Sequence, residues 1–453
     1  MMKYFILLSL LIGQALVSQS ALSKSLAAQL VIKFDEPKLL LQQISATDLS
    51  AMPSLNEAEQ SQQKLISDKL NKAQYTDLLA TLKQRPKADM SAAMAYLIGQ
   101  LALQQQQLSL GADYFTHAIK LQANFGKAYH GLGLAQLQSD NPIAATKNFA
   151  KALQLGVNDP QIYSFLGYGY IQSEHFHSAV VAYQQAKLFN PDDAQLNQAL
   201  LYAYTMAGHH DAALSLLEQM LNSTPNDKGL WLHRANALLK KDQFSQGIAS
   251  LEAAIRLGES NADNLALTAQ LQLQHGSINR ARTLYGRIWQ TQTNAPLVFE
   301  ACEYLIANQE FDAAKALLKK MSLPKNSPHG VQSQLAYLKG LLAQQQGSIA
   351  LAARSFEQAL SFNGVNGKAL LALAAVKRSQ QQSHQAQMLL LRAGALDEVK
   401  LQALTEHADL MMALGRYLKA LELLQQAADF APQEPSLFEN IQILQRLVRQ
   451  GSA

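Results

Sequence analysis

The feature that most constrains this chain is a repeat of 34 residues, which is clearest between residues 126 and 193. Residues 126–159 and 160–193 align without a gap. The aligned positions keep aromatic and small side chains in the same order: Tyr129 with Tyr163, Leu132-Gly133 with Leu166-Gly167, Ala145 with Ala179, Phe149 with Tyr183, and Ala152 with Ala186. A fixed period of this length is the sequence signature of stacked structural units, so we expect an array of repeats rather than separate globular cores.

The order of residues within each unit resembles the tetratricopeptide repeat (TPR): an aromatic residue, Leu-Gly, Ala-x3-aromatic-x2-Ala, and a closing proline such as Pro191. The resemblance implies an all-α fold, a right-handed α-solenoid of stacked helix-turn-helix units. Glycines at positions 99, 133, 167 and 340 would let the two helices of a unit approach closely. The alternation of apolar and polar residues that strands require is absent, which agrees with an all-α fold.

The resemblance covers residues 92–434, which hold about ten repeats. Units start at 92, 126, 160, 194, 228 and 262, and the unit near Ala295 starts one residue early. A cluster of proline, serine and glycine from Leu323 to Gly330 interrupts the array, which resumes near Ser333. We expect residues 435–453 to form a C-terminal capping helix, because terminal units lack a neighbour on one side.

The N-terminus has the order of a secretory signal peptide over residues 1–21: Lys3, an apolar run from Tyr4 to Val17, and small residues before position 22. Cleavage there would make the protein periplasmic, without a stable membrane anchor. The alternative is an uncleaved anchor, although the run is shorter than the usual membrane span. The single cysteine, Cys302, excludes an internal disulfide, and no cysteine stands at the cleavage point for lipid attachment.

Residues 22–91 are predicted to be an N-terminal segment with a linker at 45–53 and a degenerate capping repeat at 59–91. Within it, residues 28–34 are compatible with either a short strand or the start of a helix.

Composition and motifs argue against an enzyme. Charged residues make up 16% of the chain and the formal net charge is +4, which gives no reason to expect a nucleic-acid partner. No zinc-protease motif, nucleophile elbow or phosphate-binding loop is present, so we predict no catalytic residues and no cofactor. An enzyme would have to fit within residues 22–90, a shorter stretch than catalytic domains usually need.

Histidines cluster at two successive turns of the array. His175 and His177 follow Glu174 at one turn, and His209 and His210 precede Asp211 at the next. Because His175 and His209 lie one period apart, stacking would place the turns side by side. Imidazoles with carboxylates suit zinc or copper. The competing interpretation is that these are polar turn residues facing solvent.

The binding residues are expected on the first helices, which line a concave groove in TPR families. The family's groove positions hold mainly aromatic and uncharged polar residues here: Tyr96, Gln100, Lys127, His130, Tyr168, Gln195, Gln198, Tyr202, Asn236 and Gln270, then Phe299, Glu303, Tyr337 and Lys368. The Lys/Asn/Arg set of chaperone-binding TPR domains is not reproduced. Tyrosine and glutamine suit an extended peptide or a polysaccharide, through stacking and neutral hydrogen bonds.

The sequence therefore predicts a non-enzymatic, exported TPR scaffold that binds a partner protein through its concave groove. The resemblance points to cell-envelope, pilus or exopolysaccharide assembly. Many modest contacts along one groove would give micromolar binding, on the order of −8 kcal/mol. The alternative is a TPR protein of a secretion system that binds polysaccharide directly.

Overall fold

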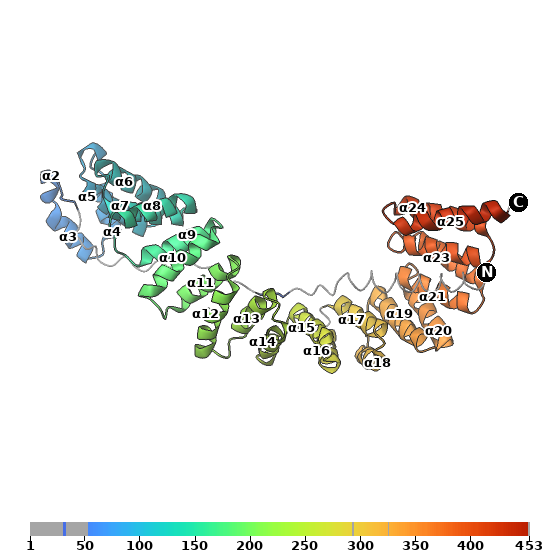
Figure 1. Cartoon of the computed structure of the whole chain (residues 1–453). Helices are drawn as coiled ribbons and strands as arrows, with labels where there is room; N and C mark the ends of the chain where they lie inside the picture. Colours follow the sequence, from blue (N-terminus) through green and yellow to red (C-terminus); the bar gives the residue numbers. More distant parts are fainter. Residues whose placement is uncertain (1–29, 33–52, 292–293, 325, 452–453) are drawn as a thin grey trace. The chain divides into compact units, whose positions relative to one another are not determined.

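The computed structural model describes residues 30–32, 53–291, 294–324 and 326–451, and every regular element within these residues is a helix. The predicted all-α class and the stacking of helix-turn-helix units are confirmed (Figure 1). The predicted signal peptide, residues 1–21, lies outside the described residues. No helix in the described ranges is long and apolar enough to span a membrane.

Ten helix pairs follow one another between residues 92 and 430. The first helices of the pairs are α5 (Ala92–Gln104), α7 (Gly126–Gln138), α9 (Gln161–Gln172), α11 (Ala194–Met206), α13 (Lys228–Lys240), α15 (Ala262–Gln274), α17 (Ala295–Ala307), α19 (His329–Gln345), α21 (Gly367–Ser379) and α23 (Lys400–Ala413). The second helices are α6 (Leu108–Leu121), α8 (Pro142–Gln154), α10 (Phe176–Phe189), α12 (His210–Ser223), α14 (Phe244–Arg256), α16 (Ile278–Thr291), α18 (Phe311–Lys320), α20 (Ile349–Phe362), α22 (Ser383–Gly394) and α24 (Tyr417–Phe430).

Shorter elements precede the pairs, and one long helix follows them. These are α2 (Glu57–Gln60), α3 (Gln63–Asn71), α4 (Tyr75–Leu82) and the 3₁₀ turn η2 (Lys87–Asp89). Helix α4 packs on α5 through the buried Leu78, Leu79 and Leu82. At the other end, α25 (Pro435–Gly451) packs on α24 through the buried Leu437 and Leu444. Each terminal pair therefore has a neighbouring helix against its outer side.

The interruption before α19 is shorter than expected. The sequence predicts that the array resumes near Ser333, but α19 begins at His329. The physical reason is Pro328, which occupies the N-cap position, where a missing backbone N–H leaves no helical hydrogen bond unmade. Helix α17 packs directly on α19, so the stacking continues past the interruption.

The turn between the two helices of every pair has the same backbone conformation. One residue adopts a positive φ in each, at positions 106, 140, 174, 208, 242, 276, 309, 347, 381 and 415. The spacing is 34 except for 33 (309 − 276) at the unit that begins at Ala295 and 38 (347 − 309) at the interruption. Positive φ suits glycine, and four of the ten positions are glycine, among them Gly208 with φ of 73°. The positions of these turns therefore mark where each repeat lies in the sequence.

Within a pair, the packing of a first helix on a second depends on residue size. A Cβ added to Gly167 would lie 2.6 Å from the ring of Tyr183, and one added to Gly133 would lie 2.8 Å from Phe149. Tyr183 and Phe149 are themselves buried. In the pair of α13 and α14, Ala235 stands at the position of this glycine. Leu251, sixteen positions later (251 − 235 = 16), stands at the position of the aromatic residue, and both side chains are buried. The departure from the TPR pattern in this unit is therefore compensated.

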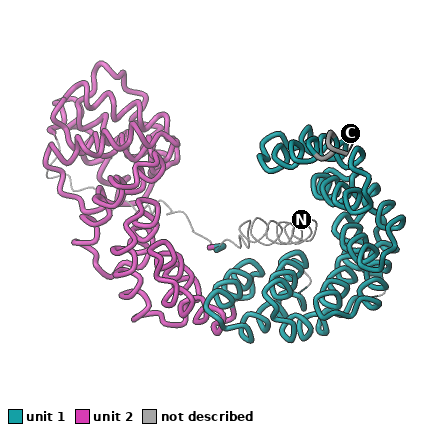
Figure 2. The backbone as a smooth tube through the Cα atoms, turned by 45° about the vertical axis from the view of Figure 1, so that its right-hand side comes forward, with its two compact units in different colours: residues 1–31, 259–453 teal, residues 32–258 magenta. Residues whose placement is uncertain are grey.

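The chain forms two compact units (Figure 2). Residues 32–258 carry α2 to α14, and their buried side chains form successive clusters between neighbouring pairs. Residues 259–453, together with 1–31, form the other unit and carry α15 to α25. Val31 therefore belongs to the same unit as α15, from which it is distant in sequence.

Candidate functional site

The first helices carry all fourteen residues predicted at groove positions, among them Gln195 on α11, Phe299 and Glu303 on α17, Tyr337 on α19 and Lys368 on α21. Tyr96 and Gln100 lie on α5, Lys127 and His130 on α7, Tyr168 on α9, Gln198 and Tyr202 on α11, Asn236 on α13, and Gln270 on α15. We call the surface that these helices present within each unit the first-helix face. The structure shows large differences in how available these side chains are.

Tyr96 is a core residue rather than an exposed groove residue. Only 6% of it is exposed, and its ring packs against Phe115 and Phe125 with centroids 5.7 and 4.9 Å away. Its hydroxyl accepts a hydrogen bond of 2.6 Å from Gln100 Nε2, and burial raises the pKa of Tyr96 above its ordinary value. Both predicted residues of α5 are thus engaged with each other at the junction between pairs.

His130 is held between aromatic rings and keeps one nitrogen unused. Its ring lies 5.9 Å from Phe149 and 6.0 Å from Phe165, and Nδ1 is 3.9 Å from Asp159 Oδ2. Nε2 is buried and has no hydrogen-bond partner among the described residues. Burial lowers the pKa of His130, and the nearby Asp159 opposes that shift. The side chain therefore favours its neutral form, which can donate or accept one further hydrogen bond.

Buried polar atoms without a hydrogen-bond partner recur in residues of the first helices. Within the described residues, Gln270 Oε1 on α15, Asn197 Oδ1 on α11 and His407 Nε2 on α23 are buried without a hydrogen-bond partner, as His130 Nε2 is on α7. Such atoms are rare in folded proteins and call for an explanation. Asn197 and His407 were not among the predicted residues, because a polar residue inside a helical period gives no sequence signal of whether its partner is present.

The other predicted residues range from half-buried to exposed. Lys127, Tyr168 and Asn236 are half-buried, and Tyr202 is half-buried against the core around α11. Gln198 is exposed. Of the fourteen predicted residues, Gln195, Gln198 and Lys368 are exposed and present the most accessible side chains for contact with a partner.

Two charged residues and one amide meet across three successive first helices of the unit containing α15 to α25. Lys368 Nζ on α21 lies 3.0 and 2.9 Å from the two carboxylate oxygens of Glu303 on α17, and Gln334 Nε2 on α19 donates to Glu303 Oε1 at 3.0 Å. Burial, and then the Glu303 charge, raise the pKa of the nearby Glu300. Glu303 and Lys368 were both predicted at groove positions, and the structure pairs them with each other.

The structure brings one pair of the four candidate metal-binding histidines together. His177 Nδ1 and His209 Nε2 are 3.2 Å apart, and both residues are exposed. His175 and His209 occupy equivalent N-cap positions, on α10 and α12, as their spacing of one period requires. In the part of the chain that the structure describes, no group of three or more His, Cys, Asp or Glu side chains is arranged to hold a metal ion. Two histidines supply fewer ligands than zinc sites in proteins normally use.

Helix α15 contacts a distant segment of its own unit through Asn264. Asn264 Oδ1 accepts a hydrogen bond from the Val31 N–H at 2.8 Å, and Asn264 Nδ2 donates one to the Val31 carbonyl at 3.0 Å. Residues 30–32 have no regular secondary structure, so neither a helix nor a strand is present in this part of the predicted 28–34 element. This contact was not predictable from the sequence pattern, because 233 residues separate its two partners.

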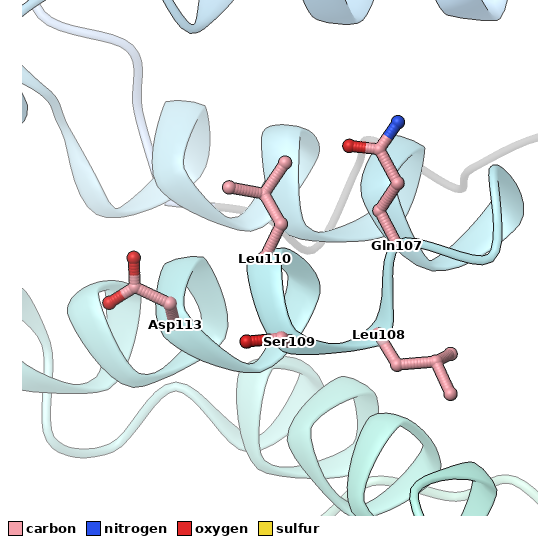
Figure 3. Close-up of a pocket in the computed structure, with 5 residues that line it drawn as sticks. All are labelled: Gln107, Leu108, Ser109, Leu110 and Asp113. Atoms are coloured by element: carbon pink, nitrogen blue, oxygen red, sulfur yellow. The ribbon is translucent and has the colours of Figure 1, made fainter.

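The surface depression at the start of α6 does not resemble a small-molecule site. One depression, of about 480 Å³, is lined by Gln107, Leu108, Ser109, Leu110 and Asp113 at the start of α6. Figure 3 shows that these side chains point in different directions rather than toward a common centre. Asp113 is also paired with Lys87. An arrangement of this kind lacks the convergent polar groups that orient a bound small molecule.

No protein-family model matches the chain, and no curated protein matches its sequence. Among solved structures, the chain is similar to Naa15/Naa10 bound to HypK-THB, with 16% identity over 86% of this chain and 66% of that one, at a TM-score of 0.41. It is also similar to yeast Tom70, with 12% identity over 87% and 96% of the two chains and a TM-score of 0.37. A third similarity is to YrrB, a TPR protein with an unusual peptide-binding site, with 19% identity over 42% and 95% and a TM-score of 0.36.

Proposed function

We propose that this tetratricopeptide-repeat array is a non-enzymatic, exported adaptor that binds an extended segment of a partner protein along its first-helix face. The observation that carries the proposal is the set of buried polar atoms on first helices that lack a hydrogen-bond partner: His130 Nε2, Asn197 Oδ1, Gln270 Oε1 and His407 Nε2. A buried polar group without a partner destabilises the folded protein by about 1–3 kcal/mol. A ligand that supplies donors and acceptors would remove that penalty on binding.

An extended polypeptide supplies the matching chemistry. Each of its residues offers one N–H and one carbonyl, so it can satisfy unused donors and unused acceptors alike. Imidazole and amide groups are uncharged at neutral pH when burial lowers the histidine pKa, as it does for His130 and His407. Uncharged groups recognise the donors and acceptors of a ligand rather than its net charge. This favours a ligand bound through its polypeptide backbone over an acidic polymer.

Export is proposed from the sequence of residues 1–21, which has the order of a signal peptide. An exported adaptor of this kind would serve assembly in the cell envelope, including pilus or exopolysaccharide assembly. N-terminal sequencing of the protein recovered from the periplasm would test this. A start near residue 22 is expected, and recovery of the intact N-terminus from the cytoplasm would contradict export.

Site-specific photocrosslinking of the full chain in cells tests the binding face. A photoreactive benzoylphenylalanine in place of Gln198, exposed on the first helix α11, should crosslink one protein reproducibly. The matched control places the same group at Glu218, exposed on the second helix α12. Replacing Asn197 by leucine should reduce the crosslink at position 198. Equal crosslinking from both positions, or no effect of Asn197→Leu, would refute binding at this face.

The polysaccharide alternative is tested by passing the purified protein over immobilised exopolysaccharide and measuring how much is retained. The proposal predicts that retention does not depend on Tyr168 and Tyr202. Loss of retention in a folded Tyr168→Ala, Tyr202→Ala variant would favour the polysaccharide instead.

A further inference from the structure

We infer that Asn264 forms a binding site for extended polypeptide backbone, and that residues 30–32 of the chain occupy this site as an intramolecular ligand. The inference rests on the proposed function and specifies one place on the first-helix face, one ligand class and one natural competitor. A partner that uses this site must displace the chain's own segment.

The geometry is that of backbone recognition. One carboxamide makes two hydrogen bonds to one residue: Oδ1 accepts from the Val31 N–H at 2.8 Å, and Nδ2 donates to the Val31 carbonyl at 3.0 Å. A residue of a neighbouring strand exchanges the same two bonds with its partner in an antiparallel sheet. The Asn264 side chain therefore presents to an incoming chain what a strand edge would present.

The backbone around Asn264 is fixed by bonds that leave its side chain for the ligand. The Asn264 N–H donates to the N-cap side chain of Asn261 at 3.1 Å. The Asn264 carbonyl accepts from the buried Thr268 hydroxyl at 2.7 Å. Asn264 itself is only 2% exposed. The amide is thus buried, held at both backbone groups, and directed at Val31.

The occupant is bound through its backbone rather than through its central side chain. Val31 is 41% exposed, whereas Leu30 and Ile32 on either side are half-buried. Valine and isoleucine favour extended conformations because their branched side chains restrict the backbone. A site that binds one backbone N–H and one backbone carbonyl can also bind other sequences whose backbone adopts the same extended conformation.

Exchange is favoured by the small number of bonds that hold the segment. Among the described residues, the hydrogen bonds that hold residues 30–32 are two neutral ones from a single side chain, beside the packing of the half-buried Leu30 and Ile32. A tethered ligand competes through its effective concentration, which reaches the millimolar range for flexible tethers. A free peptide of the same sequence should therefore bind the intact chain weakly, and more tightly once the segment can no longer occupy the site.

A substitution in the segment tests this in the full chain. Val31→Pro removes the N–H that donates a hydrogen bond to Asn264 Oδ1, since proline has no backbone donor. The matched control is Val31→Ala, which keeps the backbone and changes only a partly exposed side chain. The probe is a fluorescein-labelled peptide with the sequence of residues 27–35, AAQLVIKFD, followed by fluorescence polarisation.

We expect Val31→Pro to bind the peptide about tenfold more tightly than Val31→Ala, which should behave as the unmodified chain does. Adding Asn264→Asp to Val31→Pro should abolish the gain, because a carboxylate cannot donate to the peptide carbonyl. Equal affinities for Val31→Pro and Val31→Ala, or a gain that survives Asn264→Asp, would overturn the inference. Circular dichroism of each variant establishes that the helical array is intact.

Hydrogen exchange gives a second, independent readout that needs no peptide. The Val31 amide should exchange slowly in the unmodified chain and rapidly in Asn264→Asp. Rapid exchange in both would show that the segment does not occupy the site.

The result is separable from that of crosslinking at Gln198. Peptide binding at Asn264 without a crosslinked partner would support this site and contradict the proposed adaptor function. A crosslinked partner without peptide binding would do the reverse.

Discussion

Replacing Gly167 by alanine tests the packing that sets the distance between the two helices of a pair. The added Cβ would lie 2.6, 2.7 and 2.8 Å from three carbons of the Tyr183 ring. Favourable carbon contacts are found at about 3.5–4.0 Å, so the ring or the backbone must move by about 1 Å. Tyr183 is 2% exposed, so other residues surround its ring and would have to shift with it. Overpacking of this kind destabilises a protein by about 1–3 kcal/mol.

Hydrogen exchange is the appropriate assay, because an array of repeats opens locally and does not have to unfold as a single unit. With 1.4 kcal/mol for each factor of ten, the amides of α9 and α10 should exchange roughly 5- to 150-fold faster in Gly167→Ala. Amides of α21 and α22, in the other unit, should be unaffected. The control is Gly330→Ala, where an added Cβ meets no atom within 4 Å.

A compensating substitution separates this mechanism from a general effect of mutating a helix. The unit with Ala235 and Leu251 already carries alanine with leucine at the equivalent positions. We therefore expect Tyr183→Leu to reduce the effect of Gly167→Ala, with a coupling of at least about 1 kcal/mol in the double-mutant cycle. Unchanged exchange in Gly167→Ala, or strictly additive effects in the double variant, would refute the reasoning.

Four further outcomes are expected. Gly208→Ala should destabilise the pair of α11 and α12 by about 1 kcal/mol, measured by hydrogen exchange, because Gly208 has a φ of 73° that alanine tolerates poorly. The Cys302 thiol, which is fully buried and whose pKa is raised to about 12 by burial, should resist a thiol reagent at pH 8 until denaturant is added; rapid labelling of the native chain would contradict its burial. Burial lowers the pKa of His233 to about 4, so the unfolded chain binds its proton first as pH falls below about 6.5. Stability around α13 should then decrease by at most about 2 kcal/mol between pH 7 and pH 5, an effect that His233→Gln should remove. Isothermal titration with zinc should give no micromolar binding at the His177–His209 pair, since two protein ligands are fewer than zinc sites normally have. Tight binding that His177→Ala abolishes would contradict this expectation.

The repeat register was predictable from the sequence because it depends on residues that recur at a fixed spacing. Glycine at 133 and 167 with an aromatic residue sixteen positions later is a local signal, and the structure packs each of these pairs together. The early start of the unit at Ala295 was also visible, since Phe311 and Ala314 shift with it. The start of α19 was misplaced because the glycine slot at 340 fixes the register of a helix but not its first residue.

The contacts of the candidate site were much less predictable. A groove position in the family pattern places a residue on a first helix, but it does not say whether that residue faces solvent or the next pair. Tyr96 meets Phe125 and becomes part of the core, whereas Gln198 stays exposed. The bond from Lys368 to Glu303 spans 65 residues, and that from Asn264 to Val31 spans 233. No periodic pattern encodes contacts at such separations.

The regular spacing of the left-handed turns bears on how such a chain can change in length. The one insertion in the series, which lengthens the interval from 34 to 38 residues, falls before α19. The lengthened interval includes the connection after α18, which ends at Lys320, and the longer helix α19, which has 17 residues. The two intervals after it, from 347 to 381 and from 381 to 415, return to 34. A gain or loss of residues inside a helix would rotate the apolar face that follows it, whereas one in a connection does not. Because the later intervals return to 34, the four extra residues in this interval leave the pairs from α19 to α24 in the common register, so a change in chain length at such a junction does not disturb the pairs that follow it.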